Sequence, residues 1–126
     1  MATSINWSLN TQVTQGPKGS YSGSIDVQAY DQITVALAAG ASGVAVDIVP
    51  GTLVLYVQIT SSLYDPLLTY TVNAEADVIA LDALQLFMGS GAVGLLGDPN
   101  TLTFTNGTTE DVTVQVLVGR DAVAAP

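Results

Sequence analysis

Apolar and polar residues alternate along most of this chain. The alternation runs through residues 5–9, 21–29, 33–37, 44–48, 53–59, 70–72, 102–104 and 112–118. A period of two places one side of an extended strand on a core and the other side in solvent. Turn residues separate the runs at Gly16-Pro17, Pro50-Gly51 and Asp65-Pro66. The pattern predicts about eight to ten short antiparallel strands.

This number of strands, with turns between them, is typical of one all-β domain. We predict a single-domain antiparallel β-sandwich of jelly-roll or Greek-key type over residues 1–126, with residues 1–4 and 119–126 as flexible ends. A chain of 126 residues is long enough for one core and too short for a second domain of ordinary size.

Three segments allow more local predictions. Trp7 lies in phase with Ile5 and Leu9, so it is expected to face the core. Asn106-Gly107 lies between two alternating runs and favours a hairpin with a connection longer than two residues. Residues 74–88 are rich in helix formers but also alternate at 84, 86 and 88, and we predict a strand there, with a helix as the alternative.

The charge balance excludes one large class of partners. Eleven acidic residues face two basic ones, Lys18 and Arg120, and the net charge is −9. Such a chain repels a phosphate backbone and has no basic stripe that would release counterions, so nucleic-acid binding is not expected. Only 10% of residues are charged, against about 25% in ordinary domains. A surface of threonine and serine is covered by a partner more easily than one of lysine and glutamate.

The residue types needed for most catalysis are absent. The chain has no histidine and no cysteine, which removes the commonest general base, the thiolate nucleophile and the usual transition-metal ligands. The carboxylates are expected to face solvent or cap turns rather than act as acid and base; they are Asp26, Asp47, Glu75, Asp77, Glu110 and Asp111. We therefore predict no enzyme activity, no catalytic residues and no cofactor.

Two weaker motifs have some features of binding sites. Asp98, Asn100, Asn106, Glu110 and Asp111 offer oxygen ligands for calcium, but the glycine and closing glutamate of a calcium loop are missing, so no metal site is predicted. Gly89-x-Gly91-x-x-Gly94 has the spacing of a dinucleotide fingerprint. It lacks the strand and helix that give the motif its function, so no nucleotide is expected there.

The most apolar part of the chain lies near its middle. Residues 78–97 contain Asp82, Gln85 and four glycines, and no basic flank, so we predict a buried or interfacial segment rather than a membrane span. Neighbouring positions are apolar at Leu86 and Phe87, so one inner face cannot cover them all. We predict an oligomer interface here, formed by Leu84, Leu86, Phe87, Met88, Val93, Leu95 and Leu96. The expected partner is a second copy of the chain, in a homo-oligomer such as a trimer.

Taken as a whole, the chain resembles the small, acidic, cysteine-free, Val/Thr/Gly-rich β proteins that form or decorate the virions of tailed bacteriophages. The likeness covers the alternating strands from Ile5 to Val118 and their short turns, and it carries no diagnostic motif. The resemblance implies a head, decoration or tail component that self-associates, is located in the virion and contacts other virion proteins. Without a signal peptide at the given start, the expected location is otherwise cytoplasmic.

A binding module for glycan or another small ligand is the alternative function. Its candidate stacking residues are aromatic; they are Trp7, Tyr21, Tyr30, Tyr56, Tyr64 and Tyr70. A pair of exposed aromatics beside polar groups would favour the binding module, whereas a broad apolar interface would favour the assembly subunit.

Overall fold

The computed structural model describes residues 3–48, 52–73, 78–96 and 101–122. These residues form ten strands and one five-residue helix. The elements in chain order are β1 Thr3–Gln12, β2 Lys18–Val27, β3 Ala29–Leu37, β4 Val44–Asp47, β5 Thr52–Ser61, β6 Leu68–Val72, β7 Ile79–Ala80, β8 Gln85–Met88, α1 Ser90–Gly94, β9 Thr101–Asn106 and β10 Val112–Ala122.

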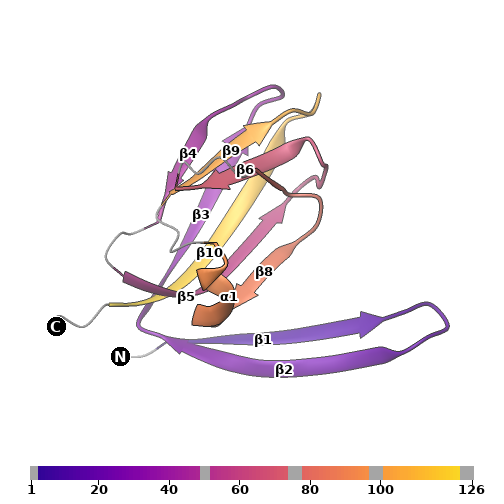
Figure 1. The fold of residues 1–126 in the computed structure, drawn as a ribbon, viewed down its shortest axis with the longest axis vertical. Helices are drawn as coiled ribbons and strands as arrows, with labels where there is room; N and C mark the ends of the chain where they lie inside the picture. The colour runs from indigo at the N-terminus through magenta and orange to yellow at the C-terminus, as the bar shows by residue number, and fades with distance from the viewer. Residues whose placement is uncertain (1–2, 49–51, 74–77, 97–100, 123–126) are drawn as a thin grey trace.

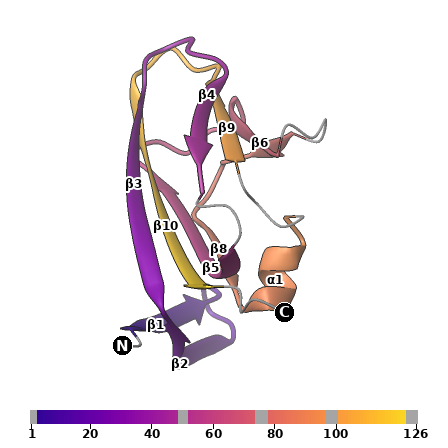
Figure 2. The ribbon, with the colours of Figure 1, turned by 90° about the vertical axis from the view of Figure 1, so that its left-hand side faces the viewer.

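Eight of the strands form two facing four-stranded sheets. Their orders are β3-β10-β5-β8 and β4-β9-β6-β7, and every pairing is antiparallel. The pairs are nested: β3 lies beside β10, β4 beside β9, β5 beside β8 and β6 beside β7. This is a long hairpin rolled up on itself, which is the jelly-roll arrangement. Figure 2 shows the two sheets edge-on, with α1 near one end of the sandwich. The predicted antiparallel β-sandwich of jelly-roll type is confirmed.

The alternation of the sequence places the core between the sheets. Strand β10 contributes four valines at 112, 114, 116 and 118, all at most 2% exposed, while Thr113 and Gln115 between them face solvent. Strands β6 and β9 contribute Leu68, Tyr70, Leu102 and Phe104 from the facing sheet, all at most 1% exposed. β-branched residues fill a pleated surface with little loss of side-chain freedom, which is why the strands are rich in valine.

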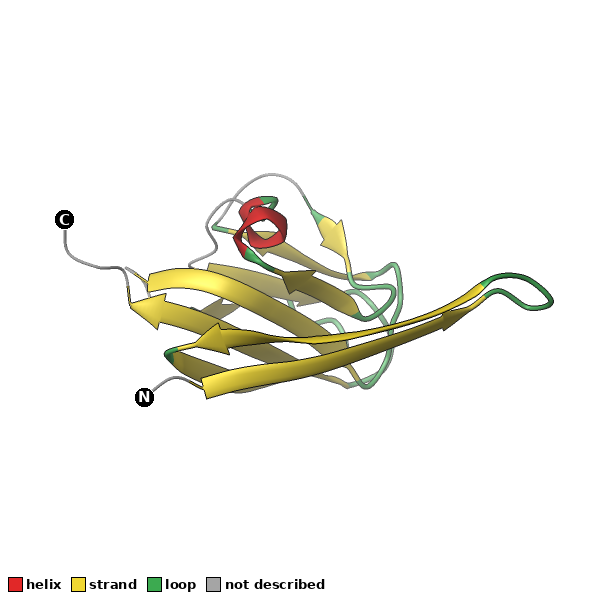
Figure 3. Cartoon of the chain, turned by 90° about the horizontal axis from the view of Figure 1, so that it is seen from below, coloured by secondary structure: helices red, strands yellow, loops and turns green. Residues whose placement is uncertain are grey.

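Strands β1 and β2 form a sheet of their own, a two-stranded ribbon that leaves the sandwich (Figures 1 and 3). We call this ribbon, residues 3–27, the arm. A tight turn closes it, in which the N–H of Val13 donates to the carbonyl of Pro17 and Gln15 adopts a positive φ of 58°. Gln28 alone separates β2 from β3, and its N–H donates to the carbonyl of Arg120 and to Asp121 Oδ1. The turn predicted at Gly16-Pro17 is confirmed, but the single-sandwich description omitted the arm.

Asn106 joins several segments of the sandwich from a fully buried position at the end of β9. Its Nδ2 donates to the carbonyl oxygens of Leu37, Ala38 and Glu110 at 3.2, 3.2 and 2.8 Å. Its Oδ1 accepts hydrogen bonds from the backbone N–H and the hydroxyl of Thr108 at 3.0 and 2.6 Å. The hairpin predicted at Asn106-Gly107 is wrong, because β9 and β10 lie in different sheets and the connection crosses between them. The asparagine is a buried bridge rather than an exposed turn residue.

Two further predictions need correction, and a third is confirmed in part. Trp7 is not in the sandwich core; it lies half-buried on the arm. The flexible end predicted at 119–126 is wrong for residues 119–122, which continue β10, and Thr3 and Ser4 likewise belong to β1. Residues 1–2 and 123–126 lie outside the described residues. The strand predicted within 74–88 is confirmed over Ile79–Ala80 and Gln85–Met88, while 74–77 are not described.

Candidate functional site

Among the described residues, Tyr70 and Gln85 form a satisfied polar pair inside the sandwich. The Tyr70 hydroxyl donates to Gln85 Oε1 at 2.6 Å, and Gln85 Nε2 donates to the carbonyl of Ala80 at 2.7 Å. The Tyr70 ring lies 5.5 Å from that of Phe104, at a tilt of 41°. Burial raises the pKa of Tyr70 to about 12, so the hydroxyl stays protonated at neutral pH and serves as a donor. This arrangement stabilises the core and leaves no free group for a ligand.

The raised pKa of Tyr70 predicts a loss of stability at high pH. An unfolded tyrosine ionises near about 10, below the folded value, so stability is full below pH about 10 and falls as the pH rises through 12. We expect a loss of about 2–3 kcal/mol in the free energy of unfolding over this interval. Urea denaturation at several pH values between 9 and 12 measures it.

Tyr70→Phe should flatten this pH dependence, while Tyr30→Phe should retain it because Tyr30 is 57% exposed. Some slope will remain in Tyr70→Phe, since burial also raises the pKa of Tyr56. Equal slopes in the two variants would contradict the assignment to Tyr70.

The carboxylates accept hydrogen bonds within the chain. Asp26 accepts from the Ser4 hydroxyl at 2.6 Å, and Asp47 from the Thr101 hydroxyl at 3.3 Å. Asp111 accepts from the backbone N–H of Ala39 at 3.0 Å. Asp26 lies on the arm and Asp47 on β4 of the β4-β9-β6-β7 sheet, so these two acids belong to different sheets. Glu75, Asp77, Asp98 and Asn100 lie outside the described residues.

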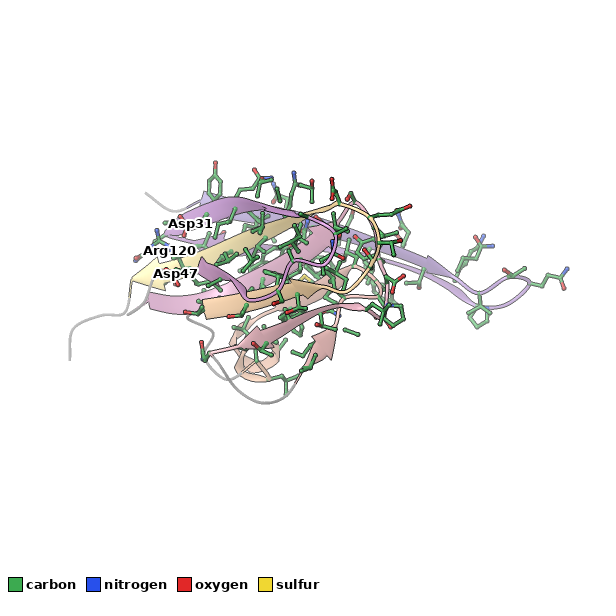
Figure 4. The ribbon with its side chains drawn as sticks, turned by 90° about the horizontal axis from the view of Figure 1, so that it is seen from above. Asp31, Asp47 and Arg120 are labelled. Carbon is green, nitrogen blue, oxygen red and sulfur yellow. The ribbon has the colours of Figure 1, made fainter. Side chains whose placement is uncertain are left out.

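One ion pair occurs among the described residues. Arg120 Nε lies 2.7 Å from Asp31 Oδ2, between the neighbouring strands β10 and β3 (Figure 4). Both side chains are partly exposed, at 21% and 33%, so the pair contributes at most about 1 kcal/mol to stability. It fixes the end of β10 next to the start of β3, where the arm begins. Within the described ranges, no group of three or more acidic residues lies close enough to hold a metal ion.

The arm has one apolar and one polar face. Directly paired residues share a face, and the pairs Ile5 with Ile25, Trp7 with Gly23 and Leu9 with Tyr21 lie on the apolar one. The opposite face carries serine, asparagine and Lys18. The two glycines give the aromatic rings room. A Cβ on Gly23 would lie 2.8 Å from the Trp7 indole, and one on Gly19 would lie 2.7 Å from the Tyr21 ring. The rings therefore lie over bare backbone and form a flat apolar surface.

Only the root of this apolar face is covered. Val27 is 1% exposed, and a Cβ added to Gly119 of β10 would meet Ile5 Cδ1 at 2.6 Å and Val27 Cγ1 at 3.0 Å. Gly119 lies at a register shift in β10 and pairs with Tyr56 of β5, on the outer face of the β3-β10-β5-β8 sheet. Further out, Leu9 and Tyr21 are 43% and 59% exposed. The face that packs at the root thus continues uncovered toward the tip.

Open hollows lie on the arm and on the sandwich. One of about 490 Å³ follows the arm tip and is lined by Asn10, Thr11, Gln12, Lys18, Gly19 and Ser20. Since only the arm lines it, it has no facing wall, and a small ligand there would remain largely in water. Another of about 260 Å³ is lined by the polar residues Thr60, Ser61, Ser62, Thr113 and Gln115. Neither has the enclosed apolar walls of a ligand pocket.

The predicted interface residues separate into two groups. Val93 and Leu96 are 3% and 7% exposed and belong to the core of this subunit, so they cannot form an interface directly. Phe87 is half-buried and packs against the same core. Leu86 and Met88 pair with Gln58 and Tyr56, on the outer face of β8. Leu84 and Leu95 are 53% and 83% exposed. Leu84, Leu86, Met88 and Leu95 therefore remain as interface candidates.

The sequence analysis did not predict that residues 3–27 form an arm separate from the sandwich. The signal was available in residues 5–27, where two alternating runs flank a short turn and carry two glycines on the apolar side. Of the predicted aromatic candidates, Tyr21 and Tyr30 are the more exposed, at 59% and 57%, while Tyr64 is 37% exposed and Tyr56 and Tyr70 are buried. None of the helices in the described residues has the length and apolarity needed to cross a bilayer.

Comparison with known proteins yields a distant likeness. No protein-family model matches the chain, and no curated protein matches it. Among solved structures, the chain is similar to the cupin domain of Cnp3 from Schizosaccharomyces pombe. The identity is 16%, the TM-score is 0.45, and the match covers 94% of this chain and 84% of that one. The likeness concerns the β-sandwich fold and carries no information about function.

Proposed function

We propose that this chain is a non-enzymatic structural subunit that associates with further copies of itself in a larger assembly. The observation that carries the proposal is the arm, whose apolar face is covered at Val27 and uncovered at Leu9 and Tyr21. A two-stranded ribbon is at best marginally stable in water, and it gains stability when a third layer covers its apolar face. A neighbouring subunit would provide that layer.

The surface and the chemistry of the sandwich support the same function. The chain lacks histidine and cysteine, and its net charge of −9 comes with only 10% charged residues. Such a surface can be buried at low desolvation cost. Asp26, Asp47 and Asp111 accept hydrogen bonds from other groups of the chain.

We further propose that the assembly is the virion of a tailed bacteriophage, in its head, decoration layer or tail. The support is the sequence resemblance described above together with the jelly roll, a fold used in viral capsids. The same fold also occurs in lectins, so the fold by itself does not select a function.

Glycan binding is the second candidate, and one observation favours it. Trp7 and Tyr21 belong to successive residue pairs on the apolar face of the arm, and their rings lie over Gly23 and Gly19. Flat exposed aromatic rings beside polar side chains can stack on sugars. The absence of a facing wall at the arm makes this the weaker candidate.

Solution mass tests the proposal. We expect size-exclusion chromatography with light scattering to give a defined multiple of 12.9 kDa that falls toward the monomer on dilution. A strict monomer across the micromolar to near-millimolar range would overturn the assembly function. Binding of a glycan to that monomer, lost in Tyr21→Ala, would establish the second candidate instead.

A further inference from the structure

The uncovered part of the arm matches a second apolar surface of the same chain. The uncovered residues of the arm are Leu9 and Tyr21, which lie on its apolar face toward the tip. The second surface comprises the half-buried Leu86 and Met88 on the outer face of β8 and Leu84, which lies immediately before this strand and is 53% exposed. In its own subunit the arm crosses the sheet near β10 and β5 and then projects beyond the sandwich (Figures 1 and 3). The distal arm is therefore free to reach a neighbour.

At the root of the arm, the apolar face already packs on a surface of its own subunit. Ile5 and Val27 pack on the outer face of the β3-β10-β5-β8 sheet at Gly119, beside Tyr56, which is only 3% exposed there. Tyr56 pairs with Met88 across the β5–β8 ladder, so the covered surface continues directly into the outer face of β8. The distal arm carries the same kind of side chains as the root. The outer face of β8 in another copy would continue the packing already present at the root.

The charge distribution favours contact through the arm. The arm, residues 3–27, carries Lys18 and Asp26 and has no net charge. Residues 28–126 carry the other ten acidic residues and Arg120, which gives them a net charge of −9. Two sandwiches therefore repel each other, whereas an arm approaches a second sandwich without like-charge repulsion.

We propose that the distal arm of one subunit docks its apolar face on the outer face of β8, and on the adjacent Leu84, in a second copy. The proposal rests on the proposed self-association and names the surfaces that produce it. Arm and β8 are different surfaces, so the contact is head-to-tail, and each subunit donates one arm and accepts one. Such contacts close into a ring or continue as a filament, depending on the rotation between neighbours.

The test compares two neighbouring positions on opposite faces of β2. Tyr21→Asp places a charge on the apolar face, and Ser22→Asp places the same charge on the polar face. Both side chains are exposed, so both variants should keep the wild-type circular dichroism. Tyr21→Asp should raise the dissociation constant of the oligomer by at least about a hundredfold, because it puts an unpaired charge in the interface. Ser22→Asp should leave the dissociation constant within about threefold of wild type.

The acceptor surface has its own matched pair. Leu84→Asp should dissociate the oligomer, and Leu67→Asp should leave it intact, since Leu67 is 60% exposed and lies in the turn before β6.

The outcomes separate this inference from the proposed function. A wild-type monomer overturns both. An oligomer that persists in Tyr21→Asp overturns the arm contact and leaves self-association standing. Loss of the oligomer in Tyr21→Asp but not in Leu84→Asp overturns β8 as the acceptor. Equal loss in Tyr21→Asp and Ser22→Asp also overturns the proposal, because the apolar face would then have no special role.

Discussion

Asn106→Asp should destabilise the protein by at least about 4 kcal/mol and leave it largely unfolded near neutral pH. The wild-type amide donates to three carbonyl oxygens from a site with 0% exposure. A carboxylate of the same shape would present negative charge to those oxygens and donate nothing. An uncompensated buried charge costs about 3–5 kcal/mol, and the carbonyls that lose their donor add to that cost.

The control for this change is Asn6→Asp, which makes the same substitution on the exposed polar face of the arm. We expect its free energy of unfolding to stay within about 0.5 kcal/mol of wild type. Urea denaturation followed by circular dichroism measures both. Asn106→Ala should lie between the two, because it removes the donor without adding charge. A loss below about 1 kcal/mol in Asn106→Asp would mean that the amide is not the bridge described above.

Phe87→Asp should cost about 3–5 kcal/mol in the free energy of unfolding, whether or not the protein is assembled. Phe87 pairs with Val57, which is 0% exposed, and its side chain packs against the core from β8. A carboxylate at this position would lose most of its hydration without gaining a partner.

Leu84→Asp provides the comparison, since it introduces the same charge just before β8 on a side chain that is 53% exposed. Its free energy of unfolding, measured on the dissociated protein, should change by less than about 1 kcal/mol. Denaturation must be followed by circular dichroism rather than by fluorescence, because Trp7 lies on the arm and reports its surroundings there. If Phe87→Asp proved as stable as Leu84→Asp, Phe87 would belong to an exposed surface, as the sequence-based interface prediction placed it.

The strands and the fold class could be predicted because they depend on local patterning. In β10, valines at alternate positions face the core and the residues between them face solvent, as a period of two requires. The same pattern led to a wrong prediction for the arm, namely that Trp7 faces the core of the sandwich. Ile5, Trp7 and Leu9 alternate like a core strand, but the period indicates only that one face avoids water. It does not indicate whether that face is covered by the same chain, by another chain or by neither.

The role of single residues depends on contacts that are distant in sequence. Asn106 bonds to Leu37 and Ala38, far along the chain, so its local Asn-Gly context suggested a hairpin that does not form. Val93 and Leu96 looked like interface residues because two neighbouring phases of the segment are apolar. The short helix α1 places Val93 in the core, and Leu96 enters the core just after the helix ends. A five-residue helix among glycines gives too weak a pattern to predict.

The nested pairing of the jelly roll sets an order of events during synthesis. Leu37 of β3 pairs with Val112 of β10, so the β3 edge stays open until the last described strand has been made. Contacts this distant in sequence form slowly, and unpaired strands are prone to wrong association in the meantime. The arm closes through a turn at residues 13–17 and pairs within itself, so it needs nothing that follows. A growing chain therefore completes its arm before it contains the finished sheet that, in the proposed assembly, receives the arm of a neighbour.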